Sequence, residues 1–294
     1  MTGPTEGLAR SVHTRLIRHA RKSHLDPNLV LVRYGVERFL YRLSRSPHSD
    51  RFVLKGALLL QIWLGETARA TRDADLLGIG EWSDSFLLSV FREICRHPVV
   101  DDGLVFDPES VRLSDIRETD PYGGRRVNLV GHLGAGRITV QVDVGIGDAV
   151  EPGPEWIDYP PLLEFPSPRL RAYRPETVVA EKLQAMVRLG AANSRMKDFF
   201  DIYRLSEAYE FERDRLAEAI RATFARRGTE LPATLPTVLT SAFANESQDE
   251  QWRAFLNKNE IEPAPGFSEV TAHLAEFLSP VLARARGEDG TTAN

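Results

Sequence analysis

The sequence predicts an α/β (α+β) protein in which a mixed-sheet N-terminal half precedes a helical C-terminal half. Segments with strand-like alternation are confined to the first half of the chain. The clearest is 137–144, where the aliphatic residues from Ile138 to Val144 alternate with polar ones. From Pro175 onward, apolar residues recur at three- and four-residue spacing, which is typical of amphipathic helices.

The first half begins with a basic arm at 10–22, which precedes a helix at 27–44. Asp26 is a good N-cap for this helix, and Pro27 suits its first position because a missing N–H costs nothing there. The elements expected next are strands at 52–54, 70–77, 104–106, 126–133 and 137–144, with helices at 57–64 and from Ser83 to just before Pro98.

A turn-rich stretch at 145–168 separates the two halves. The helices expected after it lie at 175–189, at 194–209, around 216–224, at 238–255 and at 270–284. We therefore expect an N-terminal α/β domain at 1–168, a helical domain at 169–286 and a disordered tail at 287–294.

Composition excludes several classes of protein. The chain has 294 residues, of which 42% are hydrophobic and 27% charged, as in ordinary globular proteins. A single cysteine, Cys95, excludes an internal disulfide framework and any multi-cysteine metal site. The apolar runs are too short to span a bilayer, and the N-terminus lacks the apolar core of a signal peptide. We expect a cytoplasmic protein without a membrane partner, and a monomer because no exposed apolar heptad run stands out.

The net charge of −5 conceals an uneven distribution. Nine Lys or Arg residues lie between Arg10 and Arg45 against two acids, whereas thirteen acids lie between Asp101 and Phe165 against five arginines. Such alternation suits a protein that binds a polyanion on one face and a metal ion on another. Ordinary solvated helix surfaces are the simpler explanation, so charge alone does not decide between the two interpretations.

Asp73 and Asp75 are the most informative carboxylates. They are two residues apart on an expected strand, so both side chains point to the same face. Two close carboxylates repel unless a cation or a proton lies between them, and Mg²⁺ or Mn²⁺ accepts such hard oxygen ligands. Asp143, on the polar face of the strand at 137–144, is the candidate for a third ligand in a two-metal phosphoryl-transfer site. A bare Asp-x-Asp pair is also common in turns.

Upstream, Lys55 and Gly56 separate an expected strand from an expected helix. A glycine there lets backbone N–H groups approach a phosphate at the helix N-terminus, although a simple tight turn is the alternative. Further along, Lys182 lies beside an apolar helical stripe, where it reaches either solvent or an anion. Asp198 and Asp201 share a helix face, and pairing of Lys197 with Asp201 in a local salt-bridge lattice is an alternative to a catalytic role.

Together these segments resemble the AbiEii/MenT nucleotidyltransferase toxins. The resemblance covers about residues 50 to 206, in the family's order. Its motifs are Phe52-Val-Leu-Lys-Gly-Ala, Arg-x-Thr-x-Asp-x-Asp at 69–75, Glu-Lys-Leu at 181–183 and Arg-x-Lys-Asp-x-x-Asp at 195–201. It implies a polymerase-β-like nucleotidyltransferase core followed by a helical domain, with transfer of a nucleoside monophosphate from an NTP.

The resemblance also implies roles for individual residues. Asp73 and Asp75 match the metal-binding acids, Lys182 a triphosphate contact, and Asp198 a distal catalytic aspartate. Thr71 matches a hydroxyl that some relatives carry phosphorylated when the antitoxin is kinase-like. The expected nucleotide contacts are Lys55, Gly56, Arg69 and Lys182. Because Ala57 follows Gly56 where many nucleotidyltransferases have Gly or Ser, the backbone would have to hold the phosphate.

Characterised relatives modify the 3′ end of tRNA, which blocks aminoacylation until a cognate antitoxin acts. The resemblance thus implies an RNA acceptor, with the tRNA acceptor stem as the expected target, and RNA bound by the basic segments 10–45 and 169–195. Three alternatives stay open: nucleotide transfer to a small molecule or a protein, a non-catalytic relative that binds RNA or antitoxin, and a hydrolase.

Overall fold

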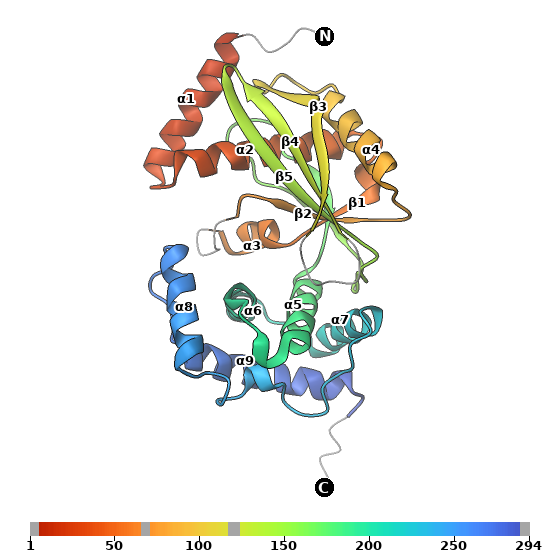
Figure 1. Ribbon diagram of the computed structural model, residues 1–294, viewed down its shortest axis with the longest axis vertical. Helices are drawn as coiled ribbons and strands as arrows, with labels where there is room; N and C mark the ends of the chain where they lie inside the picture. The colour runs from red at the N-terminus through yellow and green to blue at the C-terminus, as the bar shows by residue number, and fades with distance from the viewer. Residues whose placement is uncertain (1–5, 66–70, 117–123, 289–294) are drawn as a thin grey trace. The chain divides into compact units, whose positions relative to one another are not determined.

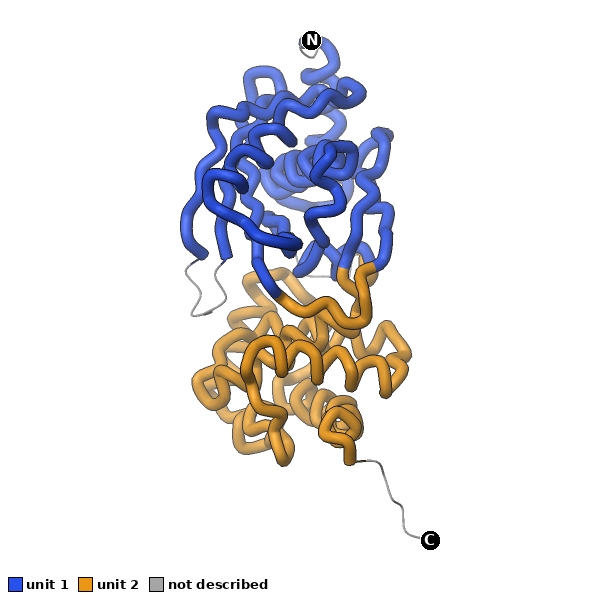
Figure 2. The backbone as a smooth tube through the Cα atoms, turned by 90° about the vertical axis from the view of Figure 1, so that its right-hand side faces the viewer, with its two compact units in different colours: residues 1–62, 71–147, 155–172 blue, residues 63–70, 148–154, 173–294 orange. Residues whose placement is uncertain are grey.

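The computed structural model describes residues 6–65, 71–116 and 124–288. The chain forms two compact units (Figure 2). Unit 1 comprises 1–62, 71–147 and 155–172, and unit 2 comprises 63–70, 148–154 and 173–294. The domain limits expected from the sequence stay a prediction, and most of the expected tail lies outside the described residues. No helix in the described part of the chain is long and apolar enough to cross a membrane.

Unit 1 contains a seven-stranded mixed sheet in the order β3-β4-β5-β2-β1-β7-β6 (Figure 1). The pairs β5–β2 and β1–β7 are parallel, and the other neighbouring pairs are antiparallel. The strands are β1 (Phe52–Lys55), β2 (Ala74–Gly78), β3 (Leu104–Asp115), β4 (Arg125–Leu133), β5 (Gly136–Ile146), β6 (Glu155–Asp158) and β7 (Arg169–Ala172).

The alternation in the sequence decides which face of β5 is buried. Ile138, Val140, Val142 and Val144 are buried, while the intervening Gln141 and Asp143 are only half-buried, as expected. Helix α2 (Pro27–Arg45) packs on the apolar side of this strand. Its Gly35 comes so close that a Cβ there would lie 2.8 Å from Ile138 Cγ2. The polar face of β5 is consequently turned away from α2.

Two helices of unit 1 begin at the capping residues that the sequence indicates. Asp26 accepts a hydrogen bond from the Asn28 backbone N–H at 3.0 Å, and Ser83 caps the next long helix in the same way through Phe86. The basic arm forms a helix, as the sequence allows. The bounds are α1 (Glu6–Lys22), α2 (Pro27–Arg45), α3 (Ala57–Leu64) and α4 (Asp84–Arg96), with a short 3₁₀ turn at Ser49–Arg51.

Unit 2 is built from helices around an aromatic core. The Phe199 and Phe267 rings lie 5.0 Å apart between centroids, and Trp252 lies 5.6 Å from Phe267. The helices are α5 (Pro175–Leu189), α6 (Met196–Ala208), α7 (Arg213–Arg226), α8 (Glu246–Lys258) and α9 (Phe267–Ala285), with 3₁₀ turns at Gly190–Ala192 and Thr237–Leu239.

Two expectations about secondary structure were wrong. The helix expected over 238–255 begins only at Glu246, because the Asn245 side chain accepts hydrogen bonds from the next free backbone N–H groups and caps α8 there. The turn-rich stretch at 145–168 contains a strand, β6. Its residues are half-buried or exposed, and Trp156 is among the exposed ones, so no apolar alternation marks it.

Candidate functional site

The turn between β1 and α3 brings the backbone against a carboxylate. Gly56 has φ +75°, in the left-handed region that glycine adopts without steric cost. A Cβ at this position would lie 2.0 Å from Asp75 Oδ2, so the turn requires glycine for space as well as for conformation. Helix α3 begins directly after this turn, at Ala57.

Three of the expected site residues meet in one line across the sheet. Lys55 pairs with Asp75 across β1 and β2, and Asp75 pairs with Asp143 across β2 and β5. Because directly paired residues on neighbouring strands point to the same face, both carboxylates and the lysine share one face. Asp73 lies just before β2, which begins at Ala74 rather than near residue 70. All four residues are half-buried.

Asp73 is held by two neighbours. The Thr71 hydroxyl, which is almost buried, donates to Asp73 Oδ1 at 2.8 Å. The Gln141 amide donates to Asp73 Oδ2 at 3.3 Å and reaches Asp143 Oδ1 at 3.5 Å. Gln141 was not among the residues expected from the sequence. Its place on the polar face of β5, two residues before Asp143, was the signal that could have identified it.

Asp143 is engaged by an arginine that the sequence reasoning also missed. Arg126 on β4 donates through Nε to Asp143 Oδ1 at 2.8 Å and through Nη2 to Oδ2 at 2.7 Å. This is the bidentate geometry that a guanidinium adopts with a carboxylate. Since Arg126 and Asp143 are direct register partners, the pairing of β4 with β5 determines the contact, and no sequence motif announces it.

Asp73 and Asp75 offer the hard oxygen donors that a magnesium or manganese ion accepts, on the side where Gly56 leaves space for the Asp75 carboxylate. Both oxygens of Asp143 accept from Arg126 instead. Among the described residues, no group of three or more His, Cys, Asp or Glu gathers as a metal site. The donor set thus fits two carboxylate ligands, and metal binding by Asp143 stays a prediction.

Lys182 and Asp198 lie in unit 2, where they form a buried ionic cluster with Asp201. Lys182 Nζ donates to Asp198 Oδ1 at 3.0 Å and to Asp201 Oδ2 at 2.6 Å. Arg195 Nε donates to the other oxygen of Asp198 at 2.7 Å. Both carboxylates are only 1% exposed, and Lys182 is 13% exposed. In this cluster, the cation that pairs with Asp201 is Lys182, which the sequence places beside the apolar stripe of its helix.

Charges around Asp198 control its ionisation. Burial acts to raise the pKa of this carboxyl, but the positive charges of Lys182, Arg195 and Lys197 outweigh burial, so the pKa lies below its usual value. Asp198 is therefore a carboxylate at neutral pH.

Glu181, the first residue of the Glu-Lys-Leu segment, belongs to a second polar cluster in unit 2. Its Oε1 accepts from the Tyr173 hydroxyl at 3.1 Å and pairs with Arg227 Nη2 at 3.1 Å. Arg227 also binds Asp148, with Nη2–Oδ1 at 3.0 Å. These contacts join α5 to the end of α7 and to the segment at 148–154. Glu181 of the Glu-Lys-Leu motif therefore has a structural role in unit 2.

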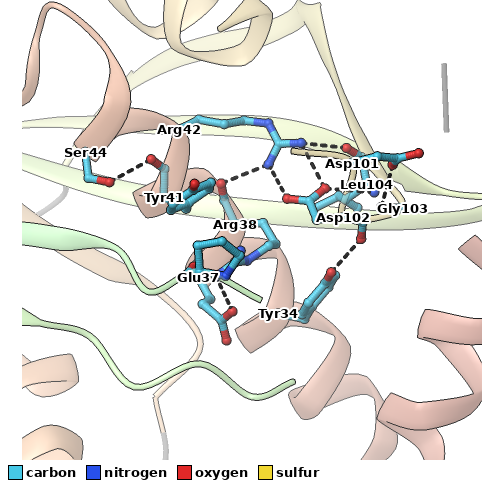
Figure 3. Close-up of polar contacts among 11 residues, drawn as sticks. Tyr34, Glu37, Arg38, Tyr41, Arg42, Ser44, Asp101, Asp102, Gly103 and Leu104 are labelled. Atoms are coloured by element: carbon cyan, nitrogen blue, oxygen red, sulfur yellow. Dashed lines mark hydrogen bonds and ion pairs between the residues drawn. The ribbon is translucent and has the colours of Figure 1, made fainter. Parts of the chain in front are cut away.

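The basic segment at 10–45 is less exposed than its composition suggests. Arg38 and Arg42 on α2 are fully or almost fully buried in ion pairs with Glu37 and Asp102 (Figure 3). Arg42 binds Asp102 through both terminal nitrogens, at 2.8 and 3.0 Å. Burial, only partly offset by Arg38, raises the pKa of Glu37. Neither arginine can hold a polyanion. The exposed basic residues of this segment are Arg10, Arg18, Arg21 and Lys22 on α1 and Arg45 at the end of α2.

The segment that follows α1 contacts the residue that precedes Asp73. Asp26, four residues after Lys22, pairs with Arg72 at 3.2 Å, and Arg72 immediately precedes Asp73. Arg69, expected to contact a nucleotide, lies outside the described residues.

Comparisons with known proteins identify the family. The family model described as nucleotidyl transferase AbiEii toxin, type IV toxin–antitoxin system, matches residues 38–273. Two crystal structures of Helicobacter pylori proteins, JHP933 and one described as a nucleotidyltransferase, are each similar at 16% identity with a TM-score of 0.46. The first match covers 85% of this chain and 90% of the other, and the second covers 86% and 93%. No curated protein matches the sequence.

The family model spans both units and includes every described residue discussed above from Arg38 to Asp201. Its members have the polymerase-β-like fold, and the mixed sheet followed by helices is the fold class that the sequence predicted. The chain belongs to the AbiEii family of nucleotidyltransferase toxins from type IV toxin–antitoxin systems.

Proposed function

We propose that this toxin transfers a nucleoside monophosphate from an NTP to the 3′ end of an RNA, with the tRNA acceptor stem as the target. Such a modification would block aminoacylation and translation until an antitoxin neutralises the enzyme. The observation that carries the proposal is the polar line across β1, β2 and β5, where Asp75 lies between Lys55 and Asp143 beside the Gly56 turn.

Asp73 and Asp75 would hold a Mg²⁺ or Mn²⁺ ion in this proposal. Such an ion, when bound, neutralises charge on the triphosphate and at the α-phosphorus. Backbone N–H groups at the start of α3 would bind phosphate oxygens, since the sequence places no hydroxyl side chain directly after Gly56. Lys55, next to Asp75, would add a positive charge close to the phosphates.

The reaction forms one bond and breaks one. The RNA 3′-oxygen attacks the α-phosphorus, and the bond from the α-phosphorus to the bridging oxygen of the leaving pyrophosphate breaks. The hydroxyl proton passes to a carboxylate, for which Asp143 and Asp198 are the candidates. Lys182 would stabilise the pyrophosphate as a compact positive charge.

Variants of Lys182 need a structural readout. Removing this charge leaves Asp198 and Asp201 buried and less compensated, which destabilises unit 2 whether or not Lys182 binds the nucleotide. The informative change is Lys182→Arg, which keeps the positive charge. Loss of activity in a variant that unfolds at the wild-type urea concentration would support a contact with the triphosphate.

The RNA backbone would bind the exposed basic residues of α1 through salt-sensitive phosphate contacts. The antitoxin could act at Thr71, whose hydroxyl already contacts Asp73. A phosphoryl group there would add up to two negative charges beside that carboxylate, which disfavours a bound triphosphate. Thr71→Val would then remain active in the presence of a kinase-type antitoxin, whereas the wild-type enzyme would be inhibited.

The proposed reaction is tested by incubating the purified protein with total RNA, Mg²⁺ and each α-³²P-labelled NTP in turn. A labelled tRNA-sized band is expected, which Asp73→Ala abolishes. Asp158→Ala is the matched control, because Asp158 is an exposed aspartate in the same sheet on the remote strand β6. Full activity of Asp73→Ala would refute the assignment of this carboxylate.

Other outcomes of this assay identify the alternatives. Absence of label in RNA, together with an NTP-dependent rise in melting temperature, would indicate a small-molecule or protein acceptor. Absence of both would indicate a relative that only binds RNA or antitoxin.

A further inference from the structure

Four charged residues lie side by side across four adjacent strands of unit 1. Arg126 on β4 pairs with Asp143 on β5, Asp143 with Asp75 on β2, and Asp75 with Lys55 on β1. Direct partners point to the same face of a sheet, so the row reads positive, negative, negative, positive. We call these four residues the charged row.

The two central carboxylates carry like charges at directly opposite positions, an arrangement that destabilises a sheet. The cations at either end reduce this repulsion. Arg126 does so through two hydrogen bonds to Asp143, at 2.8 and 2.7 Å. The Asp143 side chain is only 14% exposed, whereas that of Arg126 is 36% exposed. The guanidinium therefore lies at the more solvent-exposed side of the pair.

We propose that Arg126 is an exchange residue, which neutralises Asp143 in the nucleotide-free enzyme and turns to the triphosphate when a metal–nucleotide complex binds. This inference rests on the proposed function. A guanidinium presents the same planar pair of donors to a carboxylate and to a phosphate, so the exchange replaces one bidentate contact with another. Asp143 is then released to accept a proton or to bind a cation beside Asp75.

The exchange explains why a candidate catalytic carboxylate has both oxygens occupied. It also predicts that the charge of Arg126 has opposite effects on the binding of a metal ion alone and on the binding of the metal–nucleotide complex. Without nucleotide, the positive charge of Arg126 opposes a second cation near Asp75 and Asp143. With nucleotide, the same charge attracts the phosphates. A purely structural ion pair on a partly exposed sheet face contributes little to stability, and its arginine would stay on Asp143 when nucleotide binds.

The test compares Arg126→Gln with Arg125→Gln. Arg125 is the adjacent residue on β4, and its side chain leaves the opposite side of the strand to bind Asp84 at 2.7 Å. The control thus removes the same charge from the same strand without touching the charged row. Calorimetric titration measures the affinity of each protein for Mn²⁺ alone, and then for α,β-methylene nucleoside triphosphates in the presence of Mn²⁺.

Arg126→Gln is expected to tighten binding of Mn²⁺ alone by roughly tenfold and to weaken binding of the Mn²⁺–nucleotide complex by roughly tenfold, a size that one partly screened charge at close range can produce. Arg125→Gln is expected to leave both affinities at the wild-type value. Weaker binding of both ligands by Arg126→Gln, or unchanged binding of both, would overturn the exchange. Equal shifts in the two variants would also overturn it, because they would reflect net charge alone.

The proposed function has a separate readout in these experiments. A wild-type protein that labels RNA while Arg126→Gln behaves like Arg125→Gln would leave the proposed function intact and reject the exchange. A wild-type protein that binds neither nucleotide nor Mn²⁺ would reject both.

Discussion

Replacing Gly56 with alanine is expected to inactivate the enzyme far more than it destabilises the fold. The substitution has a backbone cost, because alanine at φ +75° is disfavoured by about 1–2 kcal/mol. It also has a local steric effect, since the new Cβ would lie 2.0 Å from Asp75 Oδ2. Real Cβ atoms do not approach other heavy atoms closer than 3.0 Å, so the carboxylate must move by at least 3.0 − 2.0 = 1.0 Å.

A displacement of about 1 Å at a reacting centre can reduce the rate by about 100-fold. The matched control is Gly80→Ala. Gly80 also has a left-handed φ, +89°, but a Cβ there meets nothing within 4 Å. Both variants should therefore lose about 1–2 kcal/mol of unfolding free energy, and only Gly56→Ala should lose about two orders of magnitude in kcat/KM.

The assays are urea denaturation for stability and transfer of label from α-labelled NTP for activity. Gly56→Ala with kcat/KM within threefold of that of Gly80→Ala would refute the reasoning. An equal loss of activity in the two variants would mean that the backbone cost alone accounts for the effect.

Three further predictions concern other parts of the molecule. Asp102→Ala leaves Arg42 buried without its carboxylate and should reduce the unfolding free energy by about 3–5 kcal/mol in urea, and a loss below 1 kcal/mol would contradict the buried pair. The pKa of Asp198 is lower in the folded protein than its ordinary value of 3.8, so its stabilising contribution is present at neutral pH and is lost as pH falls from that ordinary value through the folded pKa. Asp198→Asn should therefore make the unfolding free energy less dependent on pH at and below the ordinary value, and an unchanged pH profile there would count against it. The double variant Arg18→Glu and Arg21→Glu should weaken filter binding of tRNA and reduce its dependence on salt, whereas an unchanged salt slope would exclude α1 from the RNA contact.

Elements with a strong local signal were predictable from the sequence. The Asp26–Pro27 start of α2 and the aliphatic alternation of β5 depend only on capping and on period-two burial, and both are found as expected. β6 could not be predicted in this way. Strands of four residues with exposed side chains owe their conformation to pairing with a neighbour, here β7, the next strand along the chain.

The candidate site shows the same division. Asp73 and Asp75 carry a readable spacing, although only Asp75 lies within β2, which begins at Ala74. Arg126 and Gln141 carry no motif, and their contacts with Asp143 and Asp73 arise only when β4 and β2 pair with β5 in one register. Side chains that meet only through strand pairing cannot be predicted from a local sequence pattern, because a register shift of one residue would turn them to the other face of the sheet.

The register that places Asp75 opposite Asp143 is consistent with a functional role for the polar face of the sheet. Asp75 and Asp143 are direct partners with like charges, and a sheet selected for stability alone would avoid that pair. The opposite face of the same strands shows such selection, since Leu76, Val142 and Val144 are buried aliphatic residues. Two carboxylates that cost stability, bordered by two cations that limit the cost, fit the proposed binding of a cation and a polyphosphate in turn. This contrast between the faces indicates that the charged row, more than any single aspartate, is the unit that mutagenesis of this toxin should address.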